Sequence, residues 1–151
     1  MRIMCKYFDE LTTRELYEIL RVRSAVFVIE QTCIYEDIDG ADYESIHVFG
    51  REDGEISGYL RIFPKPDEAG TVQMGRVLTA RRGKGLGGEI LREGIRAAKE
   101  MLHAEKIYIE AQTYAIGFYA REGFKVCSEE FMEDGIAHVC MTRVKCAERN
   151  E

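Results

Sequence analysis

Hydrophobic positions alternate with polar ones over several short stretches of the chain, and this pattern predicts a series of β-strands. The predicted strands cover residues 2–8, 46–51, 56–63, 71–79, 106–112, 124–126 and 138–144. Asp53-Gly54 separates the second strand from the third and is typical of a hairpin turn. Asp134-Gly135 is a similar turn signal before the last strand.

Helical spacing of apolar residues fills the longer intervals between these strands. Thr12 and Glu15 have the spacing of a capping box and precede a helical pattern that continues to Phe27. A short apolar piece, 26–30, then leads into an acidic loop over 31–44. Residues 86–102 carry a wide apolar stripe, and residues 115–122 predict a short helix. The order of elements predicts an α/β domain.

Composition sets the general class of protein. The chain has 151 residues, 46% of them hydrophobic and 32% charged, which fits one domain over residues 1–151. Its apolar runs are too short for a membrane span, and MRIMCKYFDE lacks the apolar core of a signal peptide. Five scattered cysteines without a CxxC pair indicate reduced thiols and a cytoplasmic location. No metal site is expected, because the histidines show no metal-ligand spacing with these thiols.

Charge is distributed unevenly along the chain. The net charge of −6 argues against nucleic acid as a partner. The stretch 76–99 holds seven Arg or Lys against two Glu, whereas 30–44 holds six acidic residues and no Lys or Arg. Two solvated faces would explain this division. The functional interpretation is an anionic cofactor at one end of a site and a cationic substrate at the other.

The stretch QMGRVLTARRGKGLGG, residues 73–88, carries the strongest chemical signal. It places four glycines, Gly83, Gly85, Gly87 and Gly88, between a predicted strand and a predicted helix. Glycines let a backbone approach a ligand closely, and the first N–H groups of a helix attract anions. Arg81, Arg82 and Lys84 add positive side chains. We therefore predict a phosphate or pyrophosphate site, the alternative being a tight strand-to-helix turn without a ligand.

The same stretch also matches GxGxxG, the fingerprint of dinucleotide-binding folds. Glu110 even lies near the offset at which a ribose-binding acid is expected. However, only 63 residues follow Gly88, too few for the βαβ units that such a domain needs. A dinucleotide oxidoreductase is therefore disfavoured.

Two further motifs occur in order, and together they resemble a different family. Arg82-x-x-Gly85-x-Gly87 resembles the (Q/R)xxGx(G/A) loop of the GCN5-related N-acetyltransferases (GNAT), which binds the pyrophosphate of coenzyme A. QTYAIGFYAREGF, residues 112–124, resembles the second motif of that family, N-x-x-A-x-x-x-Y-x-x-x-G-F, with Gln112 where Asn is commoner. FVIEQ (27–31), Asp39-Gly40 and EDGIAH (133–138) resemble the ElaA-like branch.

This resemblance implies a fold and a reaction. The fold would be a mixed, mostly antiparallel twisted sheet flanked by helices, and the reaction acetyl transfer from acetyl-CoA to a primary amine. A bulge over Val77–Thr79 would free backbone N–H groups, with the Leu78 N–H polarising the thioester carbonyl. Val77 and Thr79 would lie along the pantetheine arm.

The resemblance also assigns roles around the two motifs. The backbone of Gly83, Gly85, Gly87 and Gly88 would hold the pyrophosphate, supported by Arg82 and Lys84, and Gln112 would bind the pantetheine. Tyr119 resembles the general acid that protonates the leaving thiolate. A tyrosine pKa of about 10 keeps such a donor protonated at neutral pH. The alternative for Tyr119 is a core aromatic.

The residues that serve the acceptor amine are left open by the sequence. Glu110 is a candidate general base, and Glu30, Asp39 and His47 are candidates for amine binding or proton relay. His138 has the simpler interpretation of a structural histidine. Arg76 would orient a substrate carboxylate or pair with an acid. A non-catalytic module that binds acyl-CoA remains the alternative function, and the C-terminal hairpin edge is a possible homodimer contact.

Overall fold

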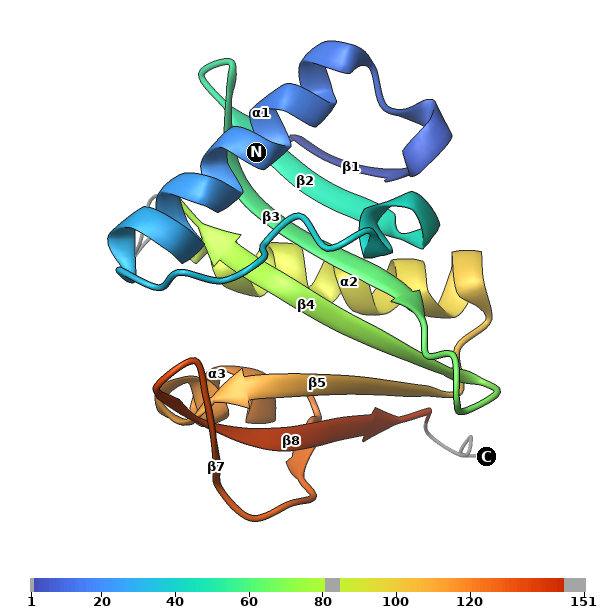
Figure 1. The fold of residues 1–151 in the computed structure, drawn as a ribbon. Coiled ribbons are helices and arrows are strands. Elements are labelled where there is room, and N and C mark those ends of the chain that lie inside the picture. Colours follow the sequence, from blue (N-terminus) through green and yellow to red (C-terminus); the bar gives the residue numbers. More distant parts are fainter. Residues whose placement is uncertain (1, 81–84, 146–151) are drawn as a thin grey trace.

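An open sheet of eight strands is the framework of the chain, described for residues 2–80 and 85–145 in a computed structural model (Figure 1). The strands are β1 (Arg2–Tyr7), β2 (Ile46–Glu52), β3 (Glu55–Pro64), β4 (Thr71–Thr79), β5 (Lys106–Gln112), β6 (Lys125–Val126), β7 (Phe131–Glu133) and β8 (Ile136–Val144). Their order is β1-β2-β3-β4-β5-β8-β6, with β7 also paired to β8. Only β4 and β5 pair in parallel among these neighbours. The predicted mixed, mostly antiparallel α/β fold is therefore confirmed.

The main helices are α1 (Thr13–Arg23) and α2 (Leu86–Leu102), and α3 (Ile116–Ala120) is a short one. The predicted capping box begins α1: the Glu15 N–H donates to Thr12 Oγ1 at 3.0 Å, and the Thr12 N–H donates to Glu15 Oε1 at 2.9 Å. Beyond Arg23 the helix does not stop, because Ser24–Glu30 continues as a π-helical segment. The predicted separate apolar piece 26–30 is therefore the end of this helix.

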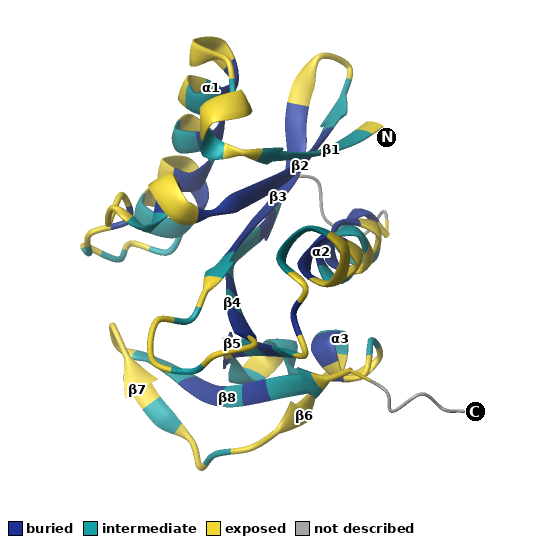
Figure 2. Ribbon diagram, turned by 90° about the vertical axis from the view of Figure 1, so that its right-hand side faces the viewer, coloured by how far each residue is buried: buried dark blue, intermediate teal, exposed yellow. Residues whose placement is uncertain are grey.

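The hydrophobic core lies on both faces of the sheet, which explains why β2 and β3 are buried almost throughout (Figure 2). On one face, Val48 and Leu60 belong to a cluster with Ile90 of α2. On the other face, Phe49 and Tyr59 pack with Ile19 of α1. Alternate residues of each strand therefore serve opposite layers. Among the described residues, no helix is long and apolar enough to cross a membrane.

The strands β4 and β5 run side by side only at their start. Their pairing covers Thr71–Gln73 and Lys106–Tyr108. Past these residues the two strands diverge, as Figure 1 shows. A pocket lined by residues of both strands lies toward their carboxyl ends. This space between β4 and β5 is called the slot.

A β-bulge in β4 lies beside the slot. Arg61 pairs with Gly75 and Tyr59 with Leu78, so β4 holds one more residue than β3 between these pairs. Arg76, inside the bulge, has a φ of 53°, in the left-handed region. The bulge therefore begins before the predicted position, Val77–Thr79.

Candidate active site

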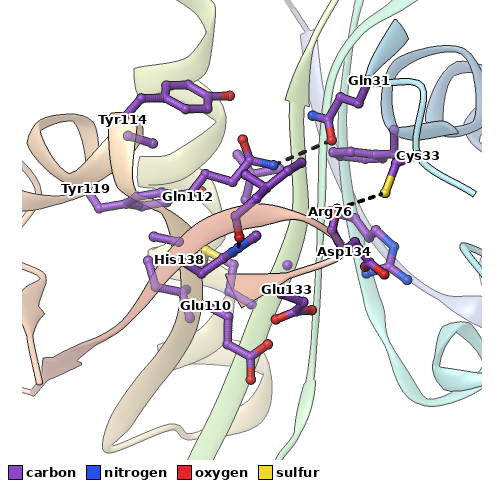
Figure 3. A pocket seen from close by; sticks show the side chains of 18 of the residues that line it. Gln31, Cys33, Arg76, Glu110, Gln112, Tyr114, Tyr119, Glu133, Asp134 and His138 are labelled. Atoms are coloured by element: carbon purple, nitrogen blue, oxygen red, sulfur yellow. Dashed lines mark hydrogen bonds between the residues drawn. The ribbon is translucent and has the colours of Figure 1, made fainter. Parts of the chain in front are cut away.

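A pocket of about 180 Å³ occupies the slot (Figure 3). One wall comes from β4, residues 73–77, and the other from β5, residues 109–112. The segment after α1 contributes Gln31, Cys33 and Tyr35. The hairpin of β7 and β8 contributes a further side, and α3 contributes Tyr119. The pocket therefore brings together parts of the chain that are far apart in the sequence.

Two contacts join the opposite sides of the pocket, as the dashed lines in Figure 3 show. Gln112 Nε2 donates to Gln31 Oε1 at 3.5 Å, and Cys33 Sγ lies 3.8 Å from the carbonyl oxygen of Asp134. Gln112, the residue predicted to bind the pantetheine arm, thus lies in the pocket wall. Sequence reasoning missed Gln31 and Cys33, although every second residue from 31 to 35 lines the pocket.

Tyr119 lines this pocket with a largely buried side chain. Its side chain is held edge-on by Phe118 and Phe124, with ring centroids 5.0 and 5.7 Å away. Only 8% of Tyr119 is exposed, and no described residue hydrogen-bonds its hydroxyl. Burial raises the pKa of Tyr119 above its usual value. The group therefore keeps its proton at neutral pH and has that proton free to donate.

The N-terminus of α2 offers donors for an anion. Gly85 is its N-cap, with a φ of 73°, and has no side chain that could accept from the first N–H groups of the helix. Because the first N–H groups of a helix lack partners within it, they remain available here. A Cβ at Gly87 would lie 3.2 Å from the Phe118 ring, so glycine suits this close packing. Gly88 continues the same turn, whereas Arg82, Gly83 and Lys84 lie outside the described residues.

The register of β4 decides which backbone N–H groups face the slot. The Ala80 N–H donates to the Ser57 carbonyl of β3 at 2.8 Å. Opposed residue pairs in antiparallel strands alternate between hydrogen-bonded and non-hydrogen-bonded pairs. Leu78 lies two residues before Ala80, so its N–H also points toward β3. The N–H groups of Val77 and Thr79 then face the slot. This argues against the role predicted for the Leu78 N–H.

Three residues predicted for the acceptor amine, Glu30, Asp39 and His47, do not line this pocket. His47 is fully buried, with Nδ1 2.7 Å from Tyr59 Oη and Nε2 2.9 Å from the Asp42 carbonyl. Burial lowers the pKa of His47, so the ring is neutral and structural. Glu30 is exposed at the end of the helical segment.

Three aspartates of the acidic run are paired with arginines. The ion pairs join Arg23 to Asp37 and Asp42, Arg61 to Asp39 and Asp42, and Arg76 to Asp37 and Asp39. Arg23 and Arg61 are buried, with 0% and 3% exposed. For these three aspartates, the interpretation as a cation-binding surface is therefore wrong. Of the two roles considered for Arg76, pairing with an acid is confirmed.

The open end of the pocket holds two carboxylates. Glu110 of β5 lines it, as its place on the strand predicted, and accepts a hydrogen bond from Tyr108 Oη at 3.0 Å. Glu133 of β7 lies opposite, and burial together with the Glu110 carboxyl raises the pKa of Glu133. Figure 3 shows both glutamates on the side of the pocket where His138 lies, with the Glu110 carboxylate directed away from His138.

Comparisons with known proteins are consistent with this geometry. Residues 12–145 match a family described as "Acetyltransferase (GNAT) domain". Protein ElaA of Escherichia coli is 35% identical over 141 residues, which cover 91% of this chain and 92% of ElaA. The crystal structure of ElaA has a TM-score of 0.88 and 33% identity, covering 94% of this chain and 98% of that one. An acyl-CoA N-acyltransferase from Pseudomonas aeruginosa has a TM-score of 0.89 and 34% identity, covering 95% and 100%.

Proposed function

The chain belongs to the GNAT acetyltransferase family, and from this premise we propose that it transfers the acetyl group of acetyl-CoA to a primary amine. The fold of this family implies coenzyme A binding. Acetyl-CoA supplies the acetyl group as a thioester, which a neutral amine attacks directly. The observation that carries the proposal is the unbonded Tyr119 hydroxyl inside the pocket.

The backbone of β4 and the start of α2 would hold and orient the cofactor. The N–H groups at the start of α2, over 86–88, would receive the phosphates, with Gly85 leaving the approach open. The Val77 N–H faces the slot and would donate to the thioester carbonyl oxygen, so we assign this role to Val77 rather than Leu78. Thr79 and Gln112 would flank the pantetheine arm.

Tyr119 would act as the general acid. Its Oη would give its proton to the sulfur as the thiolate leaves. A phenol kept neutral by burial is suited to this step, because the proton remains on oxygen until a stronger base forms beside it. Phe118 and Phe124 fix the ring, so the hydroxyl needs little reorganisation.

A Tyr119→Phe variant tests this assignment. We expect thiol release to fall by about 10² to 10⁴-fold, the usual contribution of a general acid, with little change in coenzyme A affinity. The probes are n-butylamine, butane-1,4-diamine and 4-aminobutanoate, with thiol release followed by a chromogenic reagent and coenzyme A binding by calorimetry. Tyr17→Phe on the exposed face of α1 is the matched control, since 68% of Tyr17 is exposed.

The outcomes separate the enzyme from a non-catalytic acyl-CoA-binding module. Such a module would bind coenzyme A, release no thiol with any of the three amines, and respond to Tyr119→Phe no more than to Tyr17→Phe. Gly85→Val should weaken coenzyme A binding under either hypothesis, because valine is strained at a φ of 73°. A protein that binds no coenzyme A would refute both.

A further inference from the structure

We propose that the open end of the pocket, between Glu110, Glu133 and His138, receives the acceptor as a cation and that His138 Nε2 accepts the proton the ammonium loses. This inference rests on the proposed acetyl transfer and names its acceptor class and its base. The sequence alone favoured a structural role for His138 in a hairpin, and the structure places it in the β7–β8 hairpin with its side chain also lining the pocket.

His138 has one ring nitrogen occupied and one available. Its Nδ1 lies 2.8 Å from the Ile136 carbonyl oxygen, and because a carbonyl only accepts, Nδ1 carries the proton. In the tautomer with the proton on Nδ1, the lone pair is on Nε2, which no described residue hydrogen-bonds. Only 9% of His138 is exposed, and the residue lines the pocket. A buried imidazole with an unpaired lone pair is a ready proton acceptor.

The position of this ring is fixed from two sides. His138 lies in β8 directly opposite Gln112 of β5 and Phe131 of β7. The Phe131 ring stacks on it, with centroids 5.9 Å apart and planes 24° from parallel. The imidazole is therefore held on the same face of the sheet as the pocket-lining side chains of β5.

The two carboxylates make this end of the pocket attractive to a positive charge. Glu110 and Glu133 interact, and this interaction adds to burial in raising the pKa of Glu133. An ammonium placed between them would relieve that repulsion. Tyr108 Oη already donates to Glu110 Oε2, which fixes the position of one carboxylate.

The opposite wall of the pocket carries little unpaired positive charge that would repel a cationic acceptor. Arg76 is the only Arg or Lys among the described residues that line the pocket. Its Nε lies 2.7 Å from Asp37 Oδ1, and its Nη2 lies 3.4 Å from Asp39 Oδ2. The charge of Arg76 is thus neutralised, and we expect a cationic acceptor to be preferred over an anionic one.

His138 and Tyr119 together account for every proton that moves in the reaction. His138 Nε2 takes one proton from the ammonium and leaves a neutral amine. As the N–C bond forms and the C–S bond breaks, the nitrogen loses a second proton and Tyr119 delivers one to sulfur. Tyr119 regains its proton from that nitrogen, and His138 releases the first proton to solvent. The products are an amide and a thiol, with one proton released.

Three amines of equal chain length test the acceptor class. Butane-1,4-diamine, n-butylamine and 4-aminobutanoate differ in their second charge, and we expect kcat/KM to fall in that order. Glu133→Gln should reduce the ratio of kcat/KM for the diamine to kcat/KM for 4-aminobutanoate by about tenfold, which corresponds to about 1.4 kcal/mol. Glu130→Gln, an exposed carboxylate outside the pocket, is the control and should leave the ratio unchanged.

A His138→Gln variant tests the proton acceptor. We expect kcat to fall by about 10² to 10⁴-fold while coenzyme A affinity is kept, and the acid limb of the pH profile of kcat/KM to change. His103→Asn at the exposed end of α2 is the control. The other titratable or charged groups facing the pocket are Glu110 of β5, Glu133 of β7, Asp134 of the β7–β8 turn, Arg76 of β4, Cys33 and Tyr35 after α1, and Tyr114 and Tyr119 near α3. Tyr108 and Cys140 lie behind Glu110.

Each result bears on one proposal or the other. An unchanged kcat and pH profile in His138→Gln would overturn the base, and equal kcat/KM for all three amines would overturn the cation subsite. If the wild type binds coenzyme A but releases no thiol, acetyl transfer itself fails, and so does the base. The subsite is then judged by calorimetry of butane-1,4-diamine into the coenzyme A complex. Binding that Glu133→Gln weakens would support it, and no binding would refute it.

Discussion

Replacing Asp37 with asparagine would test whether the buried ion pairs organise the segment beside the pocket. Asp37 is 7% exposed and uses both carboxylate oxygens. Oδ2 lies 3.2 Å from Arg23 Nε, whereas Oδ1 lies 2.7 Å from Arg76 Nε and accepts from Tyr35 Oη at 3.2 Å. Asparagine has the same shape but only one acceptor oxygen. Its NH₂ group would therefore face either the Arg23 Nε–H or the Arg76 Nε–H, and both of these are donors.

The expected loss of stability follows from these contacts. Breaking a buried ion pair by removing one partner typically costs about 3 to 5 kcal/mol. Arg23 keeps a 2.7 Å contact to Asp42 and a 2.9 Å contact to the Asp37 carbonyl oxygen, so the lower end applies. We expect a loss of about 3 kcal/mol in the free energy of unfolding. For a chain of this size, that lowers the melting temperature by roughly 6 to 12 °C.

Urea unfolding at neutral pH would measure this loss, with Glu36→Gln as the control. Glu36 is the exposed neighbour of Asp37, and its change should stay within about 0.5 kcal/mol. A double-mutant cycle with Arg76→Gln should show coupling of roughly 1 to 2 kcal/mol, because the two residues share a direct ion pair. An Asp37→Asn variant as stable as Glu36→Gln, or additive with Arg76→Gln, would refute the reasoning.

Three further variants address pH, packing and the cofactor. Partial burial would raise the pKa of Asp39, but hydrogen bonds from Arg61 outweigh it and lower the pKa to about 2. Its stabilisation is therefore complete above about pH 4 and lost as the pH falls toward 2, and an acid titration of Asp39→Asn should be flatter there. Gly94→Val should destabilise by about 2 kcal/mol in urea, because a Cβ would lie 2.7 Å from Leu60 Cδ2. Gly87→Val should weaken coenzyme A binding in calorimetry, and unchanged affinity would contradict the assignment of this helix end.

Much of the fold could be predicted because its signals are local. The capping box at Thr12 and the Asp53-Gly54 turn each depend on a few adjacent residues, and both occur where expected. The alternation in 106–112 also placed Glu110 and Gln112 on one face, and both line the pocket. Family motifs added what the spacing of apolar residues does not contain.

The acceptor side could not be predicted in the same way, because it depends on contacts between distant segments. The acidic run resembled a cation site until its partners were known, and Arg23 and Arg61 come from α1 and β3. A one-residue difference in register decides whether Leu78 or Val77 presents its N–H to the slot. His138 has the pattern of a structural histidine in sequence, and only the pairing of β5, β7 and β8 brings it to the pocket.

Because β4 diverges from β5, backbone N–H and C=O groups are left unpaired between these two central strands as well as at the outer edges of the sheet. Beyond Gln73 and Tyr108 these two backbones no longer pair. Exposed strand margins favour association between chains, since any extended backbone can pair with them. Coenzyme A carries amide groups along an extended arm, and in the proposed binding mode it would occupy such a margin as a short strand does. Cofactor saturation is therefore expected to slow aggregation as well as to enable the reaction.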